Sequence, residues 1–365
     1  MSEPNQKRVF IIAEAGVNHN GSLALAFELV DAAVEAGADA VKFQTFKAES
    51  LVTKHAEKAI YQQSKKQLDE TQFDMLKRLE LSHSSHRKLL EYCKKKGILF
   101  LSTAFDLESL TFLVDEIGLT TLKVSSGDLP NSPLVLAHAR TGCNLIISTG
   151  MASIEEIEVA LGAIAYANTS LSSTAKPSQE SFAEALHLKE GRDYLQSKVT
   201  LLHCTTEYPA PLSDINLNAM TTMSELFGLK VGYSDHSEGI LIPVAAVAMG
   251  AVVIEKHFTL DRCMEGPDHR SSLEPSELKE MVSSIRGVEI AKGSFNKGPS
   301  ESEVKNMVVA RKSLIAAAPI YKGEIFNEHN ICIKRPGTGL APINYWSVLG
   351  QSASREYKKD EIITL

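Results

Sequence analysis

The chain alternates short apolar runs with longer segments whose apolar residues recur at helical spacing. The runs are four or five residues long and rich in Val, Ile and Leu, which is typical of strands buried on both faces of a parallel sheet. The expected strands are Val9–Ala13, Ala40–Phe43, Ile98–Ser102, Thr121–Val124, Asn144–Ser148, Val199–His203, Lys230–Tyr233 and Ala251–Ile254.

A helical segment follows each expected strand, and several of these segments end at a glycine, as at Gly37. The expected helices are Ser22–Ala36, Ser85–Lys96, Leu107–Ile117, Pro133–Ala139, Ile154–Tyr166, Asn218–Phe227, Ile240–Gly250 and Glu274–Lys292. Regular strand–helix alternation implies parallel pairing through right-handed crossovers. Eight such units over about 290 residues predict a (β/α)8 TIM barrel.

Three stretches interrupt this pattern. Lys47–Glu70 is expected to be irregular, and the Ser-rich, polar segment Thr169–Lys198 is expected to be a surface insertion. Residues 295–304, which contain Gly298-Pro299, predict a linker. We therefore expect a barrel domain over residues 1–294 and a small β-rich domain over residues 305–365, which has little core of its own.

Composition limits the classes of function. The 365 residues include 44% hydrophobic and 23% charged ones, as in an ordinary globular protein. The net charge of −7 argues against a general binder of nucleic acid or acidic membranes. The five cysteines form no CxxC pair, and we find neither a signal peptide nor a run of about 18 apolar residues, so we expect a cytoplasmic protein outside the membrane.

Polar residues stand where each expected strand ends, and in a (β/α)8 barrel the active site lies at those ends. Lys42 and Lys123 lie within apolar strands, where a buried ammonium group is costly without an anionic partner. Hydroxyl donors accompany them at the strand ends: Ser126, Ser148 and Ser234. This combination predicts a pocket for a small molecule with two anionic groups.

Two histidines, His236 and His257, follow the last two expected strands. A lone histidine at a strand end is more often a hydrogen-bonded structural residue than a metal ligand. Two neutral imidazoles at one end of a sheet are, however, a suitable start for a divalent metal site. Glu14, at the end of the first strand, is placed for acid–base chemistry or hydrogen bonding.

Several short motifs resemble one enzyme family, in order along most of the chain. The motifs are Ile12–Gly21, Val41–Thr45, Ser148–Met151, Tyr233–His236, Glu255–Thr259, Gly266–His269 and Lys334–Gly337. They are similar to the sialic acid synthase family. The resemblance implies a metal-dependent barrel with a C-terminal antifreeze-like (SAF) domain, in a domain-swapped homodimer. It also implies condensation of phosphoenolpyruvate with an N-acetylated hexosamine to a nine-carbon α-keto acid, with loss of phosphate by C–O cleavage.

The resemblance also implies roles for individual residues. His236 and His257 would hold Mn²⁺ or Mg²⁺, which would polarise the sugar aldehyde, and Glu14 would lie near the reacting carbons. Phosphoenolpyruvate would be bound by Lys42, Thr103, Lys123, Ser126, Ser148 and Ser234. The sugar would contact Gln44, Tyr208, Asp268 and Asp128, the last of which replaces a common Glu. Arg335 would reach the N-acetyl group across the dimer.

The sequences of Cys204–Pro209 and Val231–Ser234 are similar to those of legionaminic acid synthases. The Gly266–His269 motif argues against the pseudaminic acid synthases of the family. The resemblance thus favours N,N'-diacetyllegionaminate, made from a diacetamido trideoxymannose, over N-acetylneuraminate, made from N-acetylmannosamine. One alternative is a synthase that uses a four- or five-carbon sugar phosphate, although Lys334–Gly337 suits an uncharged N-acyl sugar. Another is a non-catalytic sugar-binding barrel, against which the histidines and lysines argue.

Overall fold

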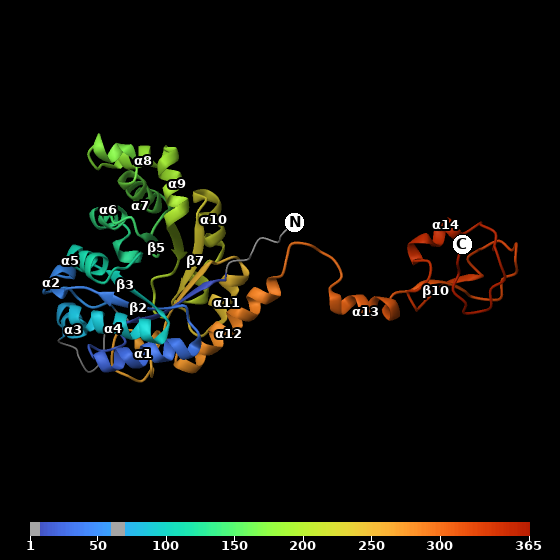
Figure 1. The fold of residues 1–365 in the computed structure, drawn as a ribbon, viewed down its shortest axis with the longest axis horizontal. Coiled ribbons are helices and arrows are strands. Elements are labelled where there is room, and N and C mark those ends of the chain that lie inside the picture. Colours follow the sequence, from blue (N-terminus) through green and yellow to red (C-terminus); the bar gives the residue numbers. More distant parts are fainter. Residues whose placement is uncertain (1–7, 60–69) are drawn as a thin grey trace. The chain divides into compact units, whose positions relative to one another are not determined.

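A closed barrel of eight parallel strands forms the centre of the first of two compact units, Met1–Gly293 and Ser294–Leu365. The computed structural model describes residues 8–59 and 70–365; the N-terminal residues 1–7, and residues 60–69 of the segment expected to be irregular, lie outside it. The strands are β1 Phe10–Gly16, β2 Ala40–Thr45, β3 Leu99–Ala104, β4 Thr121–Val124, β5 Asn144–Ser148, β6 Val199–His203, β7 Lys230–Asp235 and β8 Val253–His257. The predicted (β/α)8 fold is confirmed (Figure 1).

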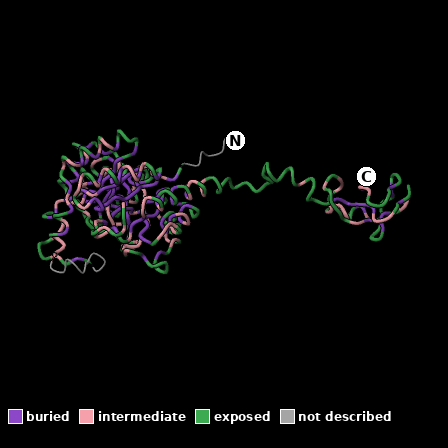
Figure 2. Tube along the Cα trace, turned by 90° about the horizontal axis from the view of Figure 1, so that it is seen from below, coloured by how far each residue is buried: buried purple, intermediate pink, exposed green. Residues whose placement is uncertain are grey.

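The strands alternate between two cores, because successive side chains of a strand point to opposite faces. One residue from each of six strands forms a small cluster across the barrel axis: Ile12, Ala40, Leu101, Ile146, Leu202 and Val253. Their neighbours, such as Ile11 and Val41, belong to the larger core between the strands and the helices. Figure 2 shows that buried residues are concentrated in this part of the barrel unit.

Several strands continue past the last apolar residue, where the sequence pattern predicted their end. β1 reaches Gly16 rather than Ala13, and β8 reaches His257 rather than Ile254. Glu14 pairs with His257 in the ladder between these two strands. The polar side chains therefore stand on regular strands, because backbone pairing continues after the side chains stop facing an apolar core.

Helices surround the barrel, in agreement with the predicted alternation (Figure 1). Ser22 caps the first helix by accepting from the backbone N–H of Leu25, and Gly37 ends it with a φ of 81°. The helices are α1 Leu23–Ala36, α2 Ala48–Leu51, α3 Gln72–Leu79, α4 His83–Lys96, α5 Leu107–Thr111, α6 Ser132–Arg140, α7 Ile154–Ala167, α10 Asn218–Phe227, α11 Leu241–Ala248 and α12 Pro275–Lys292. No helix in the described part of the chain is both long and apolar enough to cross a membrane.

The predicted surface insertion, residues 169–198, contains two helices, α8 Gln179–His187 and α9 Lys189–Lys198, that pack beside α7 (Figure 1). The ring of Phe182 is buried and contacts that of Tyr166 edge to face. Gly162 on α7 permits this close approach, because a Cβ there would lie 2.7 Å from the carbonyl oxygen of Phe182. The sequence pattern did not predict these helices, because the segment is mostly polar and few residues, such as Phe182, pack against α7.

The second unit consists of α13 Glu301–Ala310, β9 Ser313–Ala316, β10 Ile331–Lys334 and α14 Tyr345–Val348. β9 and β10 pair antiparallel, and Ile315 also bridges to Ile362, so three separate segments of the predicted β-rich domain meet. Phe326 and Tyr357 are buried in its small core. The linker was predicted to span residues 295–304, but the structure is helical from Glu301 onward, where α13 begins. Ser300 caps this helix.

We predict that Phe182→Ala lowers the free energy of unfolding by about 3 kcal/mol, because it leaves a cavity between α8 and α7. The matched control is Phe295→Ala, at a fully exposed side chain, which should change that free energy by less than about 0.5 kcal/mol. Urea denaturation followed by circular dichroism measures both. Equal effects of the two substitutions would contradict the packing of α8 on the barrel unit.

Candidate active site

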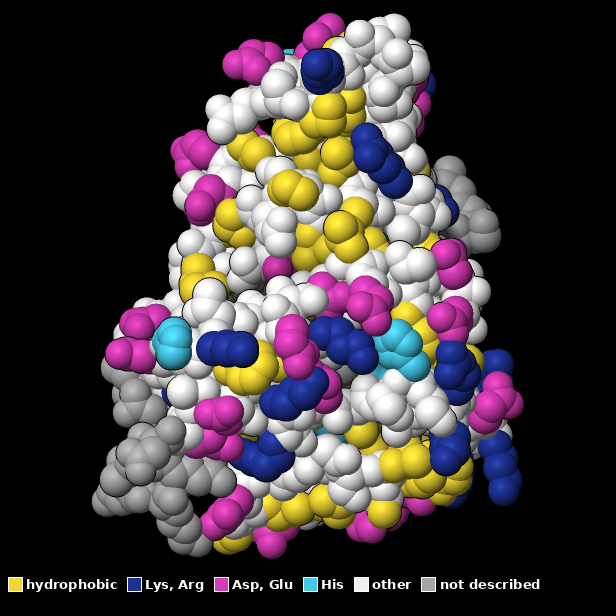
Figure 3. Space-filling view, turned by 90° about the vertical axis from the view of Figure 1, so that its left-hand side faces the viewer, with side chains coloured by type: hydrophobic (Ala, Val, Ile, Leu, Met, Phe, Trp, Pro, Cys, Tyr) yellow, Lys and Arg dark blue, Asp and Glu magenta, His cyan; other side chains and the backbone are white. Residues whose placement is uncertain are grey.

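A cavity of about 460 Å³ opens at the end of the barrel to which the carboxyl ends of the strands point. Twelve predicted site residues line it: Glu14, Lys42, Gln44, Thr103, Lys123, Ser126, Ser148, Tyr208, Ser234, His236, His257 and Asp268. Leu51, Met75 and Leu79, from α2 and α3, form an apolar wall. Figure 3 views the barrel from the side of α2 and α5, where acidic and basic side chains are intermixed across the middle.

Lys42 is buried in the cavity floor between two carboxylates. Its Nζ lies 2.7 Å from Oε2 of Glu14 and 3.6 Å from Oε2 of Glu255, and it donates to the hydroxyl of Thr103 at 3.2 Å. All four side chains come from the interior faces of strands β1, β2, β3 and β8. The ammonium group is therefore held by partners from three neighbouring strands.

Glu255 is a site residue that the sequence reasoning missed. Its Oε1 lies 3.4 Å from Nζ of Lys123 and accepts a hydrogen bond from the hydroxyl of Ser234 at 3.1 Å. Glu255 stands two residues before His257 on β8, so both side chains face the barrel axis. That period of two was the available signal, because it places an acidic side chain beside any site that includes His257.

Burial and neighbouring charges give the carboxyl groups of Glu14 and Glu255 different pKa values. Burial raises the pKa of Glu14 to about 7, although Lys42 lowers it in part. Burial would also raise the pKa of Glu255, but Lys123 and Lys42 outweigh it and bring the value to about 2. At neutral pH Glu255 is thus ionised, whereas Glu14 is divided between its protonated and ionised forms.

The two lysines obtain their anionic partners from within the chain. The sequence pattern had indicated an external anion, yet Glu255 contacts both ammonium groups and Glu14 contacts one. Burial lowers the pKa of Lys123 despite the opposing effect of Glu255. An anionic ligand would therefore compete with Glu255 and Glu14 for donors that are already oriented toward the cavity.

Hydroxyl groups complete the donor set. Lys123 donates to the hydroxyl of Ser148 at 2.6 Å. The hydroxyl oxygen of Ser126 accepts from the backbone N–H of Gly150 at 3.0 Å and lies 3.1 Å from Sγ of Cys204. These groups cluster at the ends of β4, β5 and β6, and β6 is the neighbour of β7, after which His236 follows.

His236 is held in one tautomer by the backbone. Its Nδ1 lies 2.6 Å from the carbonyl oxygen of Thr205, so Nδ1 carries the proton and donates it. Burial lowers the imidazole pKa to about 4, which keeps the ring neutral. The lone pair of Nε2 therefore points toward the hydroxyl of Tyr208, 3.2 Å away.

His257 lies beside His236, with ring centroids 5.8 Å apart. Burial lowers its pKa well below the usual value, and its buried Nδ1 has no hydrogen-bond partner among the described residues. Oδ2 of Asp268 lies 3.9 Å from this nitrogen, and burial raises the pKa of that carboxyl to about 6.

Two neutral imidazoles with available lone pairs suit a divalent metal ion. Within the described residues, however, no group of three or more His, Cys, Asp and Glu side chains is arranged to hold one. A divalent ion at this point would have His236 and His257 as protein ligands, and its further ligands would come from water or substrate.

Two predicted site residues do not line this cavity. The carboxylate of Asp128 accepts from the hydroxyl of Ser125 at 2.6 Å, within a short helical turn, and so is engaged locally. Arg335 belongs to the second unit, where its exposed side chain donates to the carbonyl oxygen of Ala310. The resemblance alone assigns both residues to the sugar.

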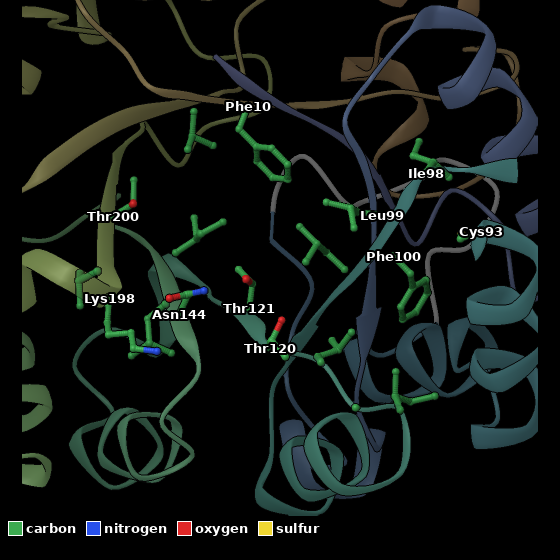
Figure 4. Close-up of a pocket in the computed structure, with 18 of the residues that line it drawn as sticks. Phe10, Cys93, Ile98, Leu99, Phe100, Thr120, Thr121, Asn144, Lys198 and Thr200 are labelled. Atoms are coloured by element: carbon green, nitrogen blue, oxygen red, sulfur yellow. The ribbon is translucent and has the colours of Figure 1, made fainter. Parts of the chain in front are cut away.

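A larger hollow of about 660 Å³ lies at the amino-terminal ends of the strands. Figure 4 shows Thr121, Asn144 and Thr200 there, together with Phe10 and Leu99. The ionisable residues among its lining are only lysines and Cys93, whose thiol pKa is raised to about 12 by burial. It lacks a paired acid and base, so we assign the chemistry to the opposite end.

We predict that Glu255→Gln lowers the free energy of unfolding by about 3 kcal/mol, since it deprives two buried lysines of a shared counter-charge. Added inorganic phosphate should stabilise this variant more than the parent, because an anion can replace the lost carboxylate. The control Glu277→Gln, at a partly exposed pair with Arg262, should cost less than about 1 kcal/mol. An equal response of parent and variant to phosphate would refute the counter-ion role.

Comparison with known proteins identifies close relatives over the whole chain. The chain is 46% identical to the N,N'-diacetyllegionaminic acid synthase of Campylobacter jejuni, over 98% of this chain and 99% of that protein. It is also 46% identical to the enzyme of the same name from Legionella pneumophila, over 94% of this chain and 90% of that protein.

A solved structure agrees with these relatives. The N-acetylneuraminic acid synthetase of Leptospira borgpetersenii, crystallised with citrate, is 34% identical and aligns with a TM-score of 0.65, over 84% of this chain and 94% of that one. The SAF domain model matches residues 311–365, and the NeuB family model matches residues 29–297. The chain belongs to the NeuB family and ends in an SAF domain.

Proposed function

We propose that the protein is a nonulosonic acid synthase, which condenses phosphoenolpyruvate with an N-acylated hexosamine and releases phosphate. The observation that carries this proposal is the 46% identity to an N,N'-diacetyllegionaminic acid synthase over nearly the full length of both chains. The cavity supports it, because donors for two anionic groups line the same cavity as two neutral imidazoles.

In this proposal Lys42 and Lys123 bind the anionic groups of phosphoenolpyruvate, with hydroxyl donors from Thr103, Ser126, Ser148 and Ser234. The short contacts of Lys42 with Glu14 and of Lys123 with Ser148 support the assignment, since they fix both ammonium groups before substrate arrives. Substrate charge would take over part of the role that Glu255 fills in the free protein.

Glu14 is our candidate for proton transfer near the reacting carbons. Its pKa of about 7 lets it both hold and release a proton at neutral pH. C3 of phosphoenolpyruvate would attack the sugar aldehyde, and water would add to C2. Glu14, with the Lys42 ammonium group 2.7 Å away, would accept a proton from this water and deliver a proton to the oxygen of the former aldehyde. The resulting tetrahedral intermediate would then lose phosphate by cleavage of the C–O bond, and the proton of its C2 hydroxyl would leave with the phosphate.

His236 and His257 are the residues that would hold a divalent metal, Mn²⁺ or Mg²⁺. Such an ion supplies Lewis-acid polarisation of a carbonyl oxygen. The carbonyl of Thr205 keeps Nε2 of His236 unprotonated, and burial keeps both rings neutral. Gln44, Tyr208 and Asp268, which line the same cavity, would orient the sugar.

The sugar we propose is a diacetamido trideoxymannose, which would give N,N'-diacetyllegionaminate. The identity of 46% to two legionaminic acid synthases supports it over the 34% identity to the sialic acid synthetase of Leptospira. N-acetylmannosamine, which would give N-acetylneuraminate, is the second candidate substrate because that structure matches most of both chains.

We expect metal-dependent phosphate release with phosphoenolpyruvate and the diacetamido sugar. The protein is first treated with a chelator, freed of it, and then supplied with Mn²⁺ or Mg²⁺, and phosphate is followed over time. Release should be lost on chelation, return with the metal, and be slower with N-acetylmannosamine. Reactions without sugar and reactions with arabinose 5-phosphate are the controls.

Each outcome of that assay distinguishes the candidates. Turnover of only the sugar phosphate would favour a related condensing synthase with a different substrate. Absence of phosphate release with every N-acyl hexosamine would contradict the enzyme proposal and favour a sugar-binding barrel. Full activity after exhaustive chelation would reject the metal role of the histidines while leaving the condensation intact.

We further propose that Arg335 contacts the N-acyl group of sugar bound in the partner's barrel, within a domain-swapped homodimer. The exposure of its side chain supports a role in contacts outside its own unit. Arg335→Ala should raise the KM for the sugar about tenfold, as expected for loss of a charged hydrogen bond, and leave the KM for phosphoenolpyruvate unchanged. Arg355→Ala, at an exposed arginine of the same unit, should alter neither constant. Equal weakening toward both substrates would contradict this role.

A further inference from the structure

A buried ion pair joins β7, which His236 follows directly, to β8, which ends at His257. The side chains of Asp235 and Lys256 are 0% and 1% exposed, and the ammonium group of Lys256 donates to Oδ2 of Asp235. The two residues are Cα partners on neighbouring strands β7 and β8. His236 and His257 directly follow them, so the imidazoles face the cavity while the ion pair faces away from it.

Ser237, which follows His236 in the sequence, is hydrogen-bonded to both members of the ion pair. The carboxylate of Asp235 accepts from the backbone N–H of Ser237 at 3.1 Å and from its hydroxyl at 3.0 Å. Lys256 also donates to the carbonyl oxygen of Ser237. The residues before and after His236 are thus both tied to the residue that precedes His257.

The energetics of such a pair indicate a role other than stability. Each buried ion loses several kcal/mol of hydration, and apolar residues of similar volume often replace a buried pair without loss of stability. Asp235, Ser237 and Lys256 leave no buried side-chain polar atom without a partner in the described structure. What a fully satisfied pair adds over apolar packing is a fixed relative position of the two backbone segments.

We propose that Asp235, Ser237 and Lys256 form a clamp that sets the separation and orientation of the His236 and His257 imidazoles. These three are positioning residues, since none of them lines the cavity. The inference deepens the proposed function and relies on it for one readout, the affinity for a metal ion. The clamp acts by locking the ends of β7 and β8, where a small shift of either strand would displace one ring relative to the other.

The test uses the full-length protein with the double substitution Asp235→Asn and Lys256→Met, which removes both charges and roughly keeps the volume. We expect its thermal midpoint to stay within about 5 °C of the parent. Its affinity for Mn²⁺, measured by titration calorimetry, should fall on the order of ten- to a hundredfold. Crystal structures of the parent and of the variant should show different distances between the His236 and His257 ring centroids. That distance is 5.8 Å in this structure.

A matched control removes a different ion pair of the barrel. Asp39→Asn with Arg286→Met deletes the contact of 2.7 Å between Asp39, which precedes β2, and Arg286 on α12. This variant should change the thermal midpoint and leave Mn²⁺ affinity unaltered. Ser237→Ala is a milder variant of the clamp, which decides the question if the double variant does not fold; we expect a loss of affinity of a few fold.

The clamp is overturned if a folded double variant, or Ser237→Ala in its place, binds Mn²⁺ within about twofold of the parent and keeps the same ring separation. A parent that binds no Mn²⁺ would instead show that the metal step of the proposed function is wrong. The ring separation in the crystals would then decide on the clamp by itself.

Discussion

The site depends on two lysines that are buried at the carboxyl ends of the barrel strands and paired with two acidic side chains. Lys42 and Lys123 share Glu255, and Glu14 completes the group at 2.7 Å from Lys42. Such charges are tolerated in a protein interior only when they are paired and hydrogen-bonded. The pairing holds buried donors in a fixed orientation before any substrate binds, which is the condition for electrostatic stabilisation of a developing charge.

Strand alternation gives the same two strands two functions. Toward the barrel axis, β7, β8 and the residue after β7 present Ser234, Glu255 and the two histidines; away from it, the strands carry the fully buried pair of Asp235 and Lys256. The chemistry and the device that we propose to position it are therefore one residue apart in sequence. Burial acts on both faces, because it keeps both imidazoles neutral and encloses the side chains of Asp235 and Lys256 behind them.

The sequence pattern predicted the barrel because eight apolar runs alternate with eight helical segments, and strand ends such as Lys42 and His257 indicated where the chemistry lies. It missed Glu255 because the strand was expected to end at Ile254, so the period of two that links Glu255 to His257 was not applied to them. It also missed α8 and α9, where Phe182 and Leu195 anchor helices that are otherwise polar. The position of Asp128 depends on a local hydrogen bond with Ser125, which no periodicity reveals.

The central claim is that this end of the barrel joins phosphoenolpyruvate to a sugar aldehyde and breaks the C–O bond of the enol phosphate. Phosphoenolpyruvate labelled with oxygen-18 in its bridging oxygen tests this directly, with mass spectrometry of both products. The account predicts that the label leaves with phosphate while a nine-carbon acid accumulates in equal amount. Label retained in a carbon product, or release of phosphate without a nine-carbon acid, would contradict it.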